Sequence, residues 1–184
     1  MMETKRTRRR FLIDTLGATA LFMMPGTVFC KVKQEEERGC FLYDDIYLEH
    51  DAGENHPEIP ARLTSISEAV TRAKWYDDLI LLKARAADPE IVSLVHDKKY
   101  IGTGKKEWDE GRLTLSTSDF GDTGISKQSY SIALKAVGGV VRAVDTAFDG
   151  KAKNAFCAVR PPGHHARRKK GTGFCIFNNI AIAA

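Results

Sequence analysis

Cysteine is scarce in this 184-residue sequence, and the few cysteines form no paired motif. There are four, and none has a second cysteine or a histidine at the close spacing of a structural zinc site. A zinc finger is therefore not indicated. We expect Cys157 and Cys175, which lie inside apolar runs, to be buried free thiols. The ordinary apolar fraction of 43% also disfavours collagen, repeat arrays and disulfide-rich miniproteins.

The body of the chain has almost no net charge. The formal charge at pH 7 is +4. Residues 1–30 contain five Lys or Arg against Glu3 and Asp14, a net of +3, so the rest of the chain carries +1. A nucleic-acid-binding domain usually shows a basic stripe over its folded surface. The body offers only one such run, Arg-Arg-Lys-Lys at 167–170, so we expect no nucleic-acid partner.

A long uninterrupted apolar run is also missing. Residues 11–29 are mostly apolar, but Asp14 and small polar residues interrupt them, so we expect no stable membrane span once the leader is removed. The segment Thr-Arg-Arg-Arg-Phe-Leu at 7–12 resembles the twin-arginine export signal of bacteria. We therefore interpret residues 1–30 as an export signal, which implies a periplasmic or otherwise exported protein. A basic-apolar anchor stays open as the alternative, and lipidation at Cys30 is disfavoured because bulky Phe29 precedes it.

Residues 31–39 are charged and show no periodicity, which predicts a linker before a domain at 40–184. The aromatic and apolar run at 41–43 predicts a first strand. A polar loop at 49–60 follows, and loops of that length in a compact domain are often functional. Pro60 opens an amphipathic helix, and Asp88 with Pro89 predicts the N-cap and first residue of a second helix.

The strongest periodic signal runs from residue 126 to residue 148. Apolar residues recur there at steps of four and three, which predicts a core-facing helix: Tyr130, Leu134, Val137, Val141, Val144 and Phe148. Gly138 and Gly139 in its middle predict the close approach of another backbone segment. The apolar run at 154–159 predicts a buried strand. Alternating strands and helices indicate an α/β fold with a mainly parallel sheet.

Two adjacent histidines, His164 and His165, follow that last strand. A bare pair of this kind is more often a surface or packing feature than a catalytic one. Here Arg-Pro-Pro-Gly at 160–163 precedes it, and prolines fix φ while glycine permits a sharp turn, so both imidazoles are held in a set direction. Open α/β sheets place active sites at the carboxyl ends of their strands. The pattern favours a proton-transfer pair over a surface accident.

The segment Arg-Pro-Pro-Gly-His-His-Ala at 160–166, with Gly-Phe-Cys-Ile-Phe-Asn-Asn at 173–179, resembles the signature of the histone deacetylase and acetylpolyamine amidohydrolase family. The match is to the class II-like branch, which has Arg-Pro-Pro-Gly before the histidines. His-Pro-Glu at 56–58, Val-His at 95–96 and Asp-Thr at 122–123 agree with it. The resemblance covers about residues 41–184 and implies the three-layer arginase/deacetylase-type α/β fold with a mainly parallel sheet.

Site residues follow from this resemblance. His164 and His165 match the family's tandem catalytic histidines, which handle the protons of the attacking water and of the departing amine. Phe174 matches an aromatic wall of the substrate channel, Gly173 its neighbour, and Asp122 a rim carboxylate that orients the substrate. A loop with His56, Glu58 and Arg62 matches the segment that shapes the rim, and we interpret these three residues as structural.

The resemblance also implies zinc-dependent hydrolysis of an acyl amide, in acetyl-lysine or in an acetylated polyamine. The family's zinc ligands, an Asp-x-His and a later Asp, are expected beyond residue 184, so we expect no metal ligand among these residues. The last helix is cut at Ala184 without a cap, which predicts a truncated chain. We accordingly expect a domain that lacks its C-terminal half, and a polypeptide that is inactive by itself.

Two alternatives to the deacetylase remain open. The first is a non-catalytic acyl-lysine-binding remnant, or pseudoenzyme. The second is a ureohydrolase related to arginase, which shares the expected fold but lacks the His-His-Ala context. Acyl group, amine and oligomeric state stay undetermined.

Overall fold

The computed structural model describes residues 38–184. The export signal expected at 1–30, the lipidation site considered at Cys30 and most of the linker expected at 31–39 lie outside the described residues. No helix in the described part of the chain is long and apolar enough to cross a membrane.

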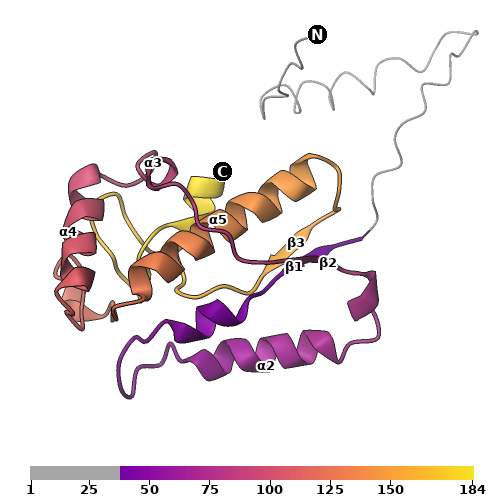
Figure 1. The fold of residues 1–184 in the computed structure, drawn as a ribbon, viewed down its shortest axis with the longest axis horizontal. Coiled ribbons are helices and arrows are strands. Elements are labelled where there is room, and N and C mark those ends of the chain that lie inside the picture. Colours follow the sequence, from indigo (N-terminus) through magenta and orange to yellow (C-terminus); the bar gives the residue numbers. More distant parts are fainter. Residues whose placement is uncertain (1–37) are drawn as a thin grey trace, which may run out of the picture. The chain divides into compact units, whose positions relative to one another are not determined.

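A small parallel sheet forms the centre of the described residues (Figure 1). Its strands are β1 (Cys40–Leu42), β2 (Ile80–Leu82) and β3 (Ala155–Cys157), in the order β2-β1-β3. The register pairs Phe41 with Leu81 on one side and with Phe156 on the other. All pairs are parallel, which confirms the α/β fold with a parallel sheet.

Helices cover both faces of this sheet, with α2 (Pro60–Thr71) on one side and α5 (Ser129–Phe148) on the other (Figure 1). Side chains alternate along β1, so Cys40 and Leu42 join an apolar cluster with Val140 of α5, whereas Phe41 joins one with Leu63 of α2. The remaining helices are α3 (Pro89–Val92), α4 (Lys98–Asp109) and α6 (Asn179–Ala183), with 3-10 turns η1 (Asp45–Glu49), η2 (Tyr76–Asp78) and η3 (Asp119–Gly121).

The expected helix starts are confirmed. Helix α2 begins at Pro60, and α3 begins at Pro89 with the Asp88 side chain accepting from the Glu90 amide at 2.9 Å. The close backbone approach expected at the glycine pair is confirmed too. A Cβ on Gly138 would lie 2.0 Å from the Arg85 carbonyl oxygen.

Strand β3 differs from expectation, because it is not buried. Phe156 is 52% exposed, Ala155 is exposed and Cys157 is partly exposed. The physical reason is position, since β3 pairs with β1 alone in the described part of the chain and so forms an edge of the sheet. Of the two cysteines expected to be buried free thiols, both are free, but only Cys175 is fully buried.

Candidate functional site

The histidine loop, residues 160–178, begins shortly after the end of β3 at Cys157. It turns at Gly163, where a Cβ would lie 2.4 Å from the Phe177 carbonyl oxygen, so only glycine allows this close approach. His164 and His165 are both exposed, and their ring centroids lie 4.2 Å apart. The two imidazoles therefore stand together beyond the carboxyl end of a parallel strand, where open α/β sheets place reactive side chains.

A buried ion pair holds the base of this loop. Arg160 and Glu58 are each 3% exposed, and the guanidinium donates to the two carboxylate oxygens at 2.6 and 2.7 Å. Arg160 also donates to the Tyr47 carbonyl oxygen at 3.0 Å. A buried charge is tolerated only with such complete pairing. The bidentate contact therefore fixes the start of the histidine loop against the loop at 49–60.

His56 lies against the predicted channel wall. Its Nδ1 accepts from the Glu58 amide at 3.1 Å, so Nε2 carries the ring proton and donates to the Asp122 carbonyl oxygen at 3.3 Å. The imidazole packs edge-on to Phe174, with ring centroids 4.5 Å apart and an interplanar angle of 77°. The sequence predicts a structural role for His56, whereas the fold brings it into contact with two predicted substrate-binding residues, Asp122 and Phe174.

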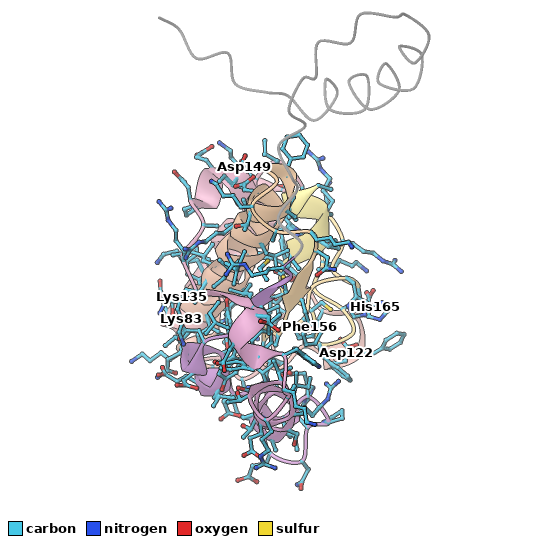
Figure 2. The ribbon with its side chains drawn as sticks, turned by 90° about the vertical axis from the view of Figure 1, so that its right-hand side faces the viewer. Lys83, Asp122, Lys135, Asp149, Phe156 and His165 are labelled. Atoms are coloured by element: carbon cyan, nitrogen blue, oxygen red, sulfur yellow. The ribbon has the colours of Figure 1, made fainter. Side chains whose placement is uncertain are left out.

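Asp122 joins the same group. Its Oδ2 accepts from the Gly173 amide at 2.8 Å and its Oδ1 from the Thr123 hydroxyl at 3.2 Å. Gly173 has a φ of +56°, and a Cβ there would lie 2.7 Å from the His165 ring. Figure 2 shows Asp122 and His165 on the same side of the molecule. We call Asp122, His56, Gly173 and Phe174 the rim cluster.

All five predicted site residues are thus brought together, although Asp122 is distant in sequence from the other four. Their chemical roles stay predictions. Arg62, expected to shape the rim, lies exposed in the first turn of α2. The structure adds an ion pair that sequence reasoning missed, in which the Lys170 ammonium donates to Asp119 Oδ1 at 2.7 Å. Nothing in the sequence pattern marks it, because the partners are far apart and both partly exposed.

Another histidine, His96, organises the end of the histidine loop. It is fully buried, and its Nε2 accepts from the Asn178 amide at 2.9 Å. The Asn178 side chain in turn accepts from the Ala181 amide at 3.1 Å as the N-cap of α6, and donates to the Ala166 carbonyl oxygen at 3.0 Å. Burial lowers the pKa of His96 below its usual value. The neutral imidazole is therefore a structural acceptor.

A third histidine, His50, lies beneath the rim. Its Nδ1 lies 2.9 Å from the Ser129 hydroxyl, and its Nε2 lies 3.8 Å from Glu58 Oε2, too far for a hydrogen bond. Burial lowers the pKa of His50 to about 4, although the Glu58 carboxylate acts in the opposite direction. His50 is therefore neutral at pH 7, with its Nδ1 in hydrogen-bond contact with the Ser129 hydroxyl.

Metal ligands are not grouped in this part of the chain. Among residues 38–184, no three His, Cys, Asp or Glu side chains are placed so that they could hold a metal ion together. The histidine pair and Asp122 do not form such a set. These residues by themselves therefore do not fit a catalytic zinc ion, which takes three protein ligands.

Comparisons with known proteins agree with the motifs. The family model "Histone deacetylase domain" matches residues 56–184. Histone deacetylase 6 of Caenorhabditis elegans is 36% identical over 147 residues, which cover 77% of this chain and 15% of that protein. The polyamine deacetylase HDAC10 of Mus musculus is 32% identical over 129 residues, covering 69% of this chain and 19% of that protein.

A solved structure, the HD domain of HDA15, superposes with a TM-score of 0.72 at 28% identity. It covers 80% of this chain and 42% of that chain. The sequence thus spans less than half of the length of each of these three proteins.

Proposed function

Because this chain belongs to the histone deacetylase family, we propose that the protein hydrolyses an acyl amide, in acetyl-lysine or in an acetylated polyamine. The observation that supports this most directly is the exposed pair His164–His165 beyond β3, packed beside the rim cluster. An amide needs a base for the attacking water and an acid for the leaving amine. Two histidines side by side can divide these two tasks between them.

The residues of this chain would bind and orient the substrate. Phe174 supplies an apolar wall for the aliphatic part of the substrate side chain, and His56 packs edge-on against that ring. Gly173 keeps the approach to His165 free of a side chain. Asp122, with its carboxylate fixed by the Gly173 amide, is positioned to accept an N–H of the substrate.

Zinc is the cofactor that we propose for the protein, as is general in the family, with its ligands outside residues 38–184. When bound, zinc would polarise the acyl carbonyl and activate water. We further propose that the 184-residue polypeptide, taken alone, hydrolyses no amide. The lack of a ligand group within the described residues supports this proposal.

The test uses two polypeptides, residues 1–184 and the longest product of the reading frame that contains them. Zinc content and acetate release are measured with an acetyl-lysine peptide and with acetylated polyamines. We expect one zinc and turnover in the longer product only, with turnover abolished in His165→Ala. Zinc-independent turnover by residues 1–184 would contradict the proposal that hydrolysis needs a zinc ion whose ligands lie outside residues 38–184.

A non-catalytic acyl-lysine-binding protein is the second candidate, and the same lack of a ligand group favours it. Binding of an acetyl-lysine peptide without acetate release, in every product of the reading frame, would establish this candidate. Measurable acetate release that depends on His165 would exclude it.

We also propose that residues 1–30 direct export through the twin-arginine route. The support is the segment Thr-Arg-Arg-Arg-Phe-Leu at 7–12 before an apolar stretch. A reporter fused behind residue 37 should reach the periplasm of a bacterial host, and Arg8→Lys/Arg9→Lys should retain it in the cytoplasm. Arg6→Lys serves as the control, because it leaves the arginine pair intact. Equal export of both variants would contradict the assignment.

A further inference from the structure

A basic hairpin follows the histidine pair and has no part in the chemistry proposed above. Residues 167–170, which we call the basic hairpin, read Arg-Arg-Lys-Lys, and all four are exposed. Two backbone hydrogen bonds between Arg167 and Lys170, at 2.9 and 3.3 Å, close the segment on itself. Arg167 comes two positions after His165, so four consecutive positive charges lie within the histidine loop.

Contacts with two other segments fix the basic hairpin beside the rim cluster. The Lys170 ammonium donates to Asp119 Oδ1 at 2.7 Å, and Asp119 belongs to η3, which leads directly into Asp122. The Asp97 amide donates to the Arg168 carbonyl oxygen at 2.9 Å. The backbone of the hairpin is therefore set by the fold, and only its side chains are free to meet a ligand.

The charge at the tip of the hairpin is not neutralised. Asp119 offsets Lys170, but within residues 38–184 neither Arg168 nor Lys169 has a carboxylate at ion-pair distance. Lys169 also borders a cavity of about 290 Å³, together with Lys99 and with two threonines, Thr103 and Thr117. The Asp97 carboxylate in the same wall is occupied as the N-cap of α4, accepting from the Lys99 amide at 2.8 Å. The cavity therefore offers space beside two lysines.

The other loop of the site carries the opposite charge. The segment that bears His56 has Asp51 and Glu54 exposed on it. The basic hairpin and the loop with His56 therefore carry charges of opposite sign. Electrostatic selection by these two segments would distinguish a charge before the acylated lysine from a charge after it.

We propose that the basic hairpin selects acyl-lysine peptides that carry acidic residues on one side of the acylated lysine. This rests on the proposed deacetylase function and narrows its substrate from acylated amines in general to acidic peptides. Carboxylates beside the acyl-lysine would meet Arg168 and Lys169, and complementary charge favours encounter and register. A polyamine brings further ammonium groups instead, and like charges repel.

The test measures peptide binding without turnover. Three fluorescent acetyl-lysine peptides carry Glu-Glu before the lysine, Glu-Glu after it, or Ser-Ser on both sides. Fluorescence anisotropy records the binding of these peptides to the His165→Ala variant of the longest product of the reading frame. We expect one acidic peptide to bind about three- to tenfold more tightly than the serine peptide, a preference that shrinks as salt is raised.

Variants assign the preference to the hairpin. Arg168→Glu/Lys169→Glu should abolish or reverse the preference for the acidic peptide, because it replaces two positive charges with negative ones. The hairpin backbone and the Lys170–Asp119 pair remain in this variant. Lys151→Glu/Lys153→Glu makes the same change in net charge next to Asp149, which Figure 2 shows well away from His165. The preference should persist in that control.

Other outcomes would overturn the proposal. Equal binding of the three peptides would do so, as would a preference that survives Arg168→Glu/Lys169→Glu. Tighter binding of an acetylated spermidine than of either acidic peptide would contradict the proposed selection. Tighter binding of a short oligonucleotide would assign the hairpin to another ligand. Absence of acetate release in the unmutated protein, with the peptide preference intact, would contradict the deacetylase function and not the role of the hairpin.

Discussion

Single residues of the site depend on backbone conformations that few side chains tolerate. Gly173 and Phe174 follow each other in the left-handed region, with φ of +56° and +68°. This pair turns the Gly173 amide toward Asp122 and brings Phe174 against His56. A strained turn of this kind persists only when surrounding contacts hold it. Here the aspartate and histidine contacts supply that support.

Gly173→Ala should separate strain from chemistry. The new Cβ would lie 2.7 Å from the His165 ring, so the imidazole must move, and we expect turnover to fall at least about tenfold. Gly111→Ala is the matched control, because Gly111 also has a positive φ, +73°, but nothing lies within 4 Å of its Cβ position. Both variants should lose about 1 kcal/mol of unfolding free energy. Equal turnover in the two variants would show that Gly173 does not keep His165 in place.

His50 predicts how stability depends on pH. Burial lowers the pKa of His50 from 6.5 to about 4, against the pull of Glu58 and with the help of Arg160. Between pH 6.5 and about 4, His50 is protonated in the unfolded chain but neutral in the folded chain. The free energy of unfolding therefore decreases as the pH falls from 6.5 to 4. The loss attributable to His50 is at most about 3 kcal/mol.

Urea unfolding at a series of pH values measures this loss. In His50→Asn, which can keep the contact with Ser129 but does not titrate, the decline between pH 6.5 and 4 should be shallower than in the unmutated protein. Identical slopes would mean that His50 does not account for the acid sensitivity.

Among the elements, helix α5 was predictable and helix α4 was not. The apolar stripe of α5 repeats at steps of three and four over its whole length, so the pattern alone predicts it. In α4 the buried positions are Tyr100, Gly104, Glu107 and Trp108, which have helical spacing but include a glycine and a glutamate. Glu107 is satisfied through Ser116, which a linear pattern does not show. Strand β2 has only three residues, too few for a periodic signal.

Two glycines in helices give opposite predictions. Gly138 of α5 lies so close to the Arg85 carbonyl oxygen that a Cβ would be 2.0 Å away, whereas Gly102 of α4 has nothing within 4 Å. Gly138→Ala should cost about 2 kcal/mol through forced displacement of the neighbouring segment. Gly102→Ala should stabilise by about 0.5–1 kcal/mol through helix propensity. Chemical denaturation compares them, and a neutral Gly138→Ala would refute the close packing of α5 on the segment at 85–87.

For the whole molecule, what the sequence predicts depends on the range of each interaction. His164, His165 and the turn at Gly163 are contiguous, so their motif predicts their juxtaposition. The contact of Asp122 with Gly173 is long-range and followed only from a family resemblance. The buried Arg160–Glu58 pair could not be predicted from charge patterns, because each residue looks like an ordinary surface charge until the fold buries it. The partial exposure of β3 likewise depends on strand order.

The exposure of β3 predicts that the chain associates with other copies of itself. Phe156 is 52% exposed on β3, stacked on Phe41 at 5.8 Å, and β3 is unpaired on its outer side within the described residues (Figure 2). An exposed apolar edge strand is a template for pairing with another chain. We therefore expect a polypeptide of residues 38–184 to self-associate at micromolar concentration in sedimentation experiments.

Phe156→Glu should weaken this association, because a charge on an edge strand opposes pairing and removes apolar area. Leu113→Glu is the control, since Leu113 is 78% exposed and belongs to none of the three strands. If the association proceeds through β3, only the first variant shifts the distribution toward monomer. Equal shifts in both variants would indicate nonspecific apolar contact, and a monomeric unmutated polypeptide would mean that the edge is protected in solution.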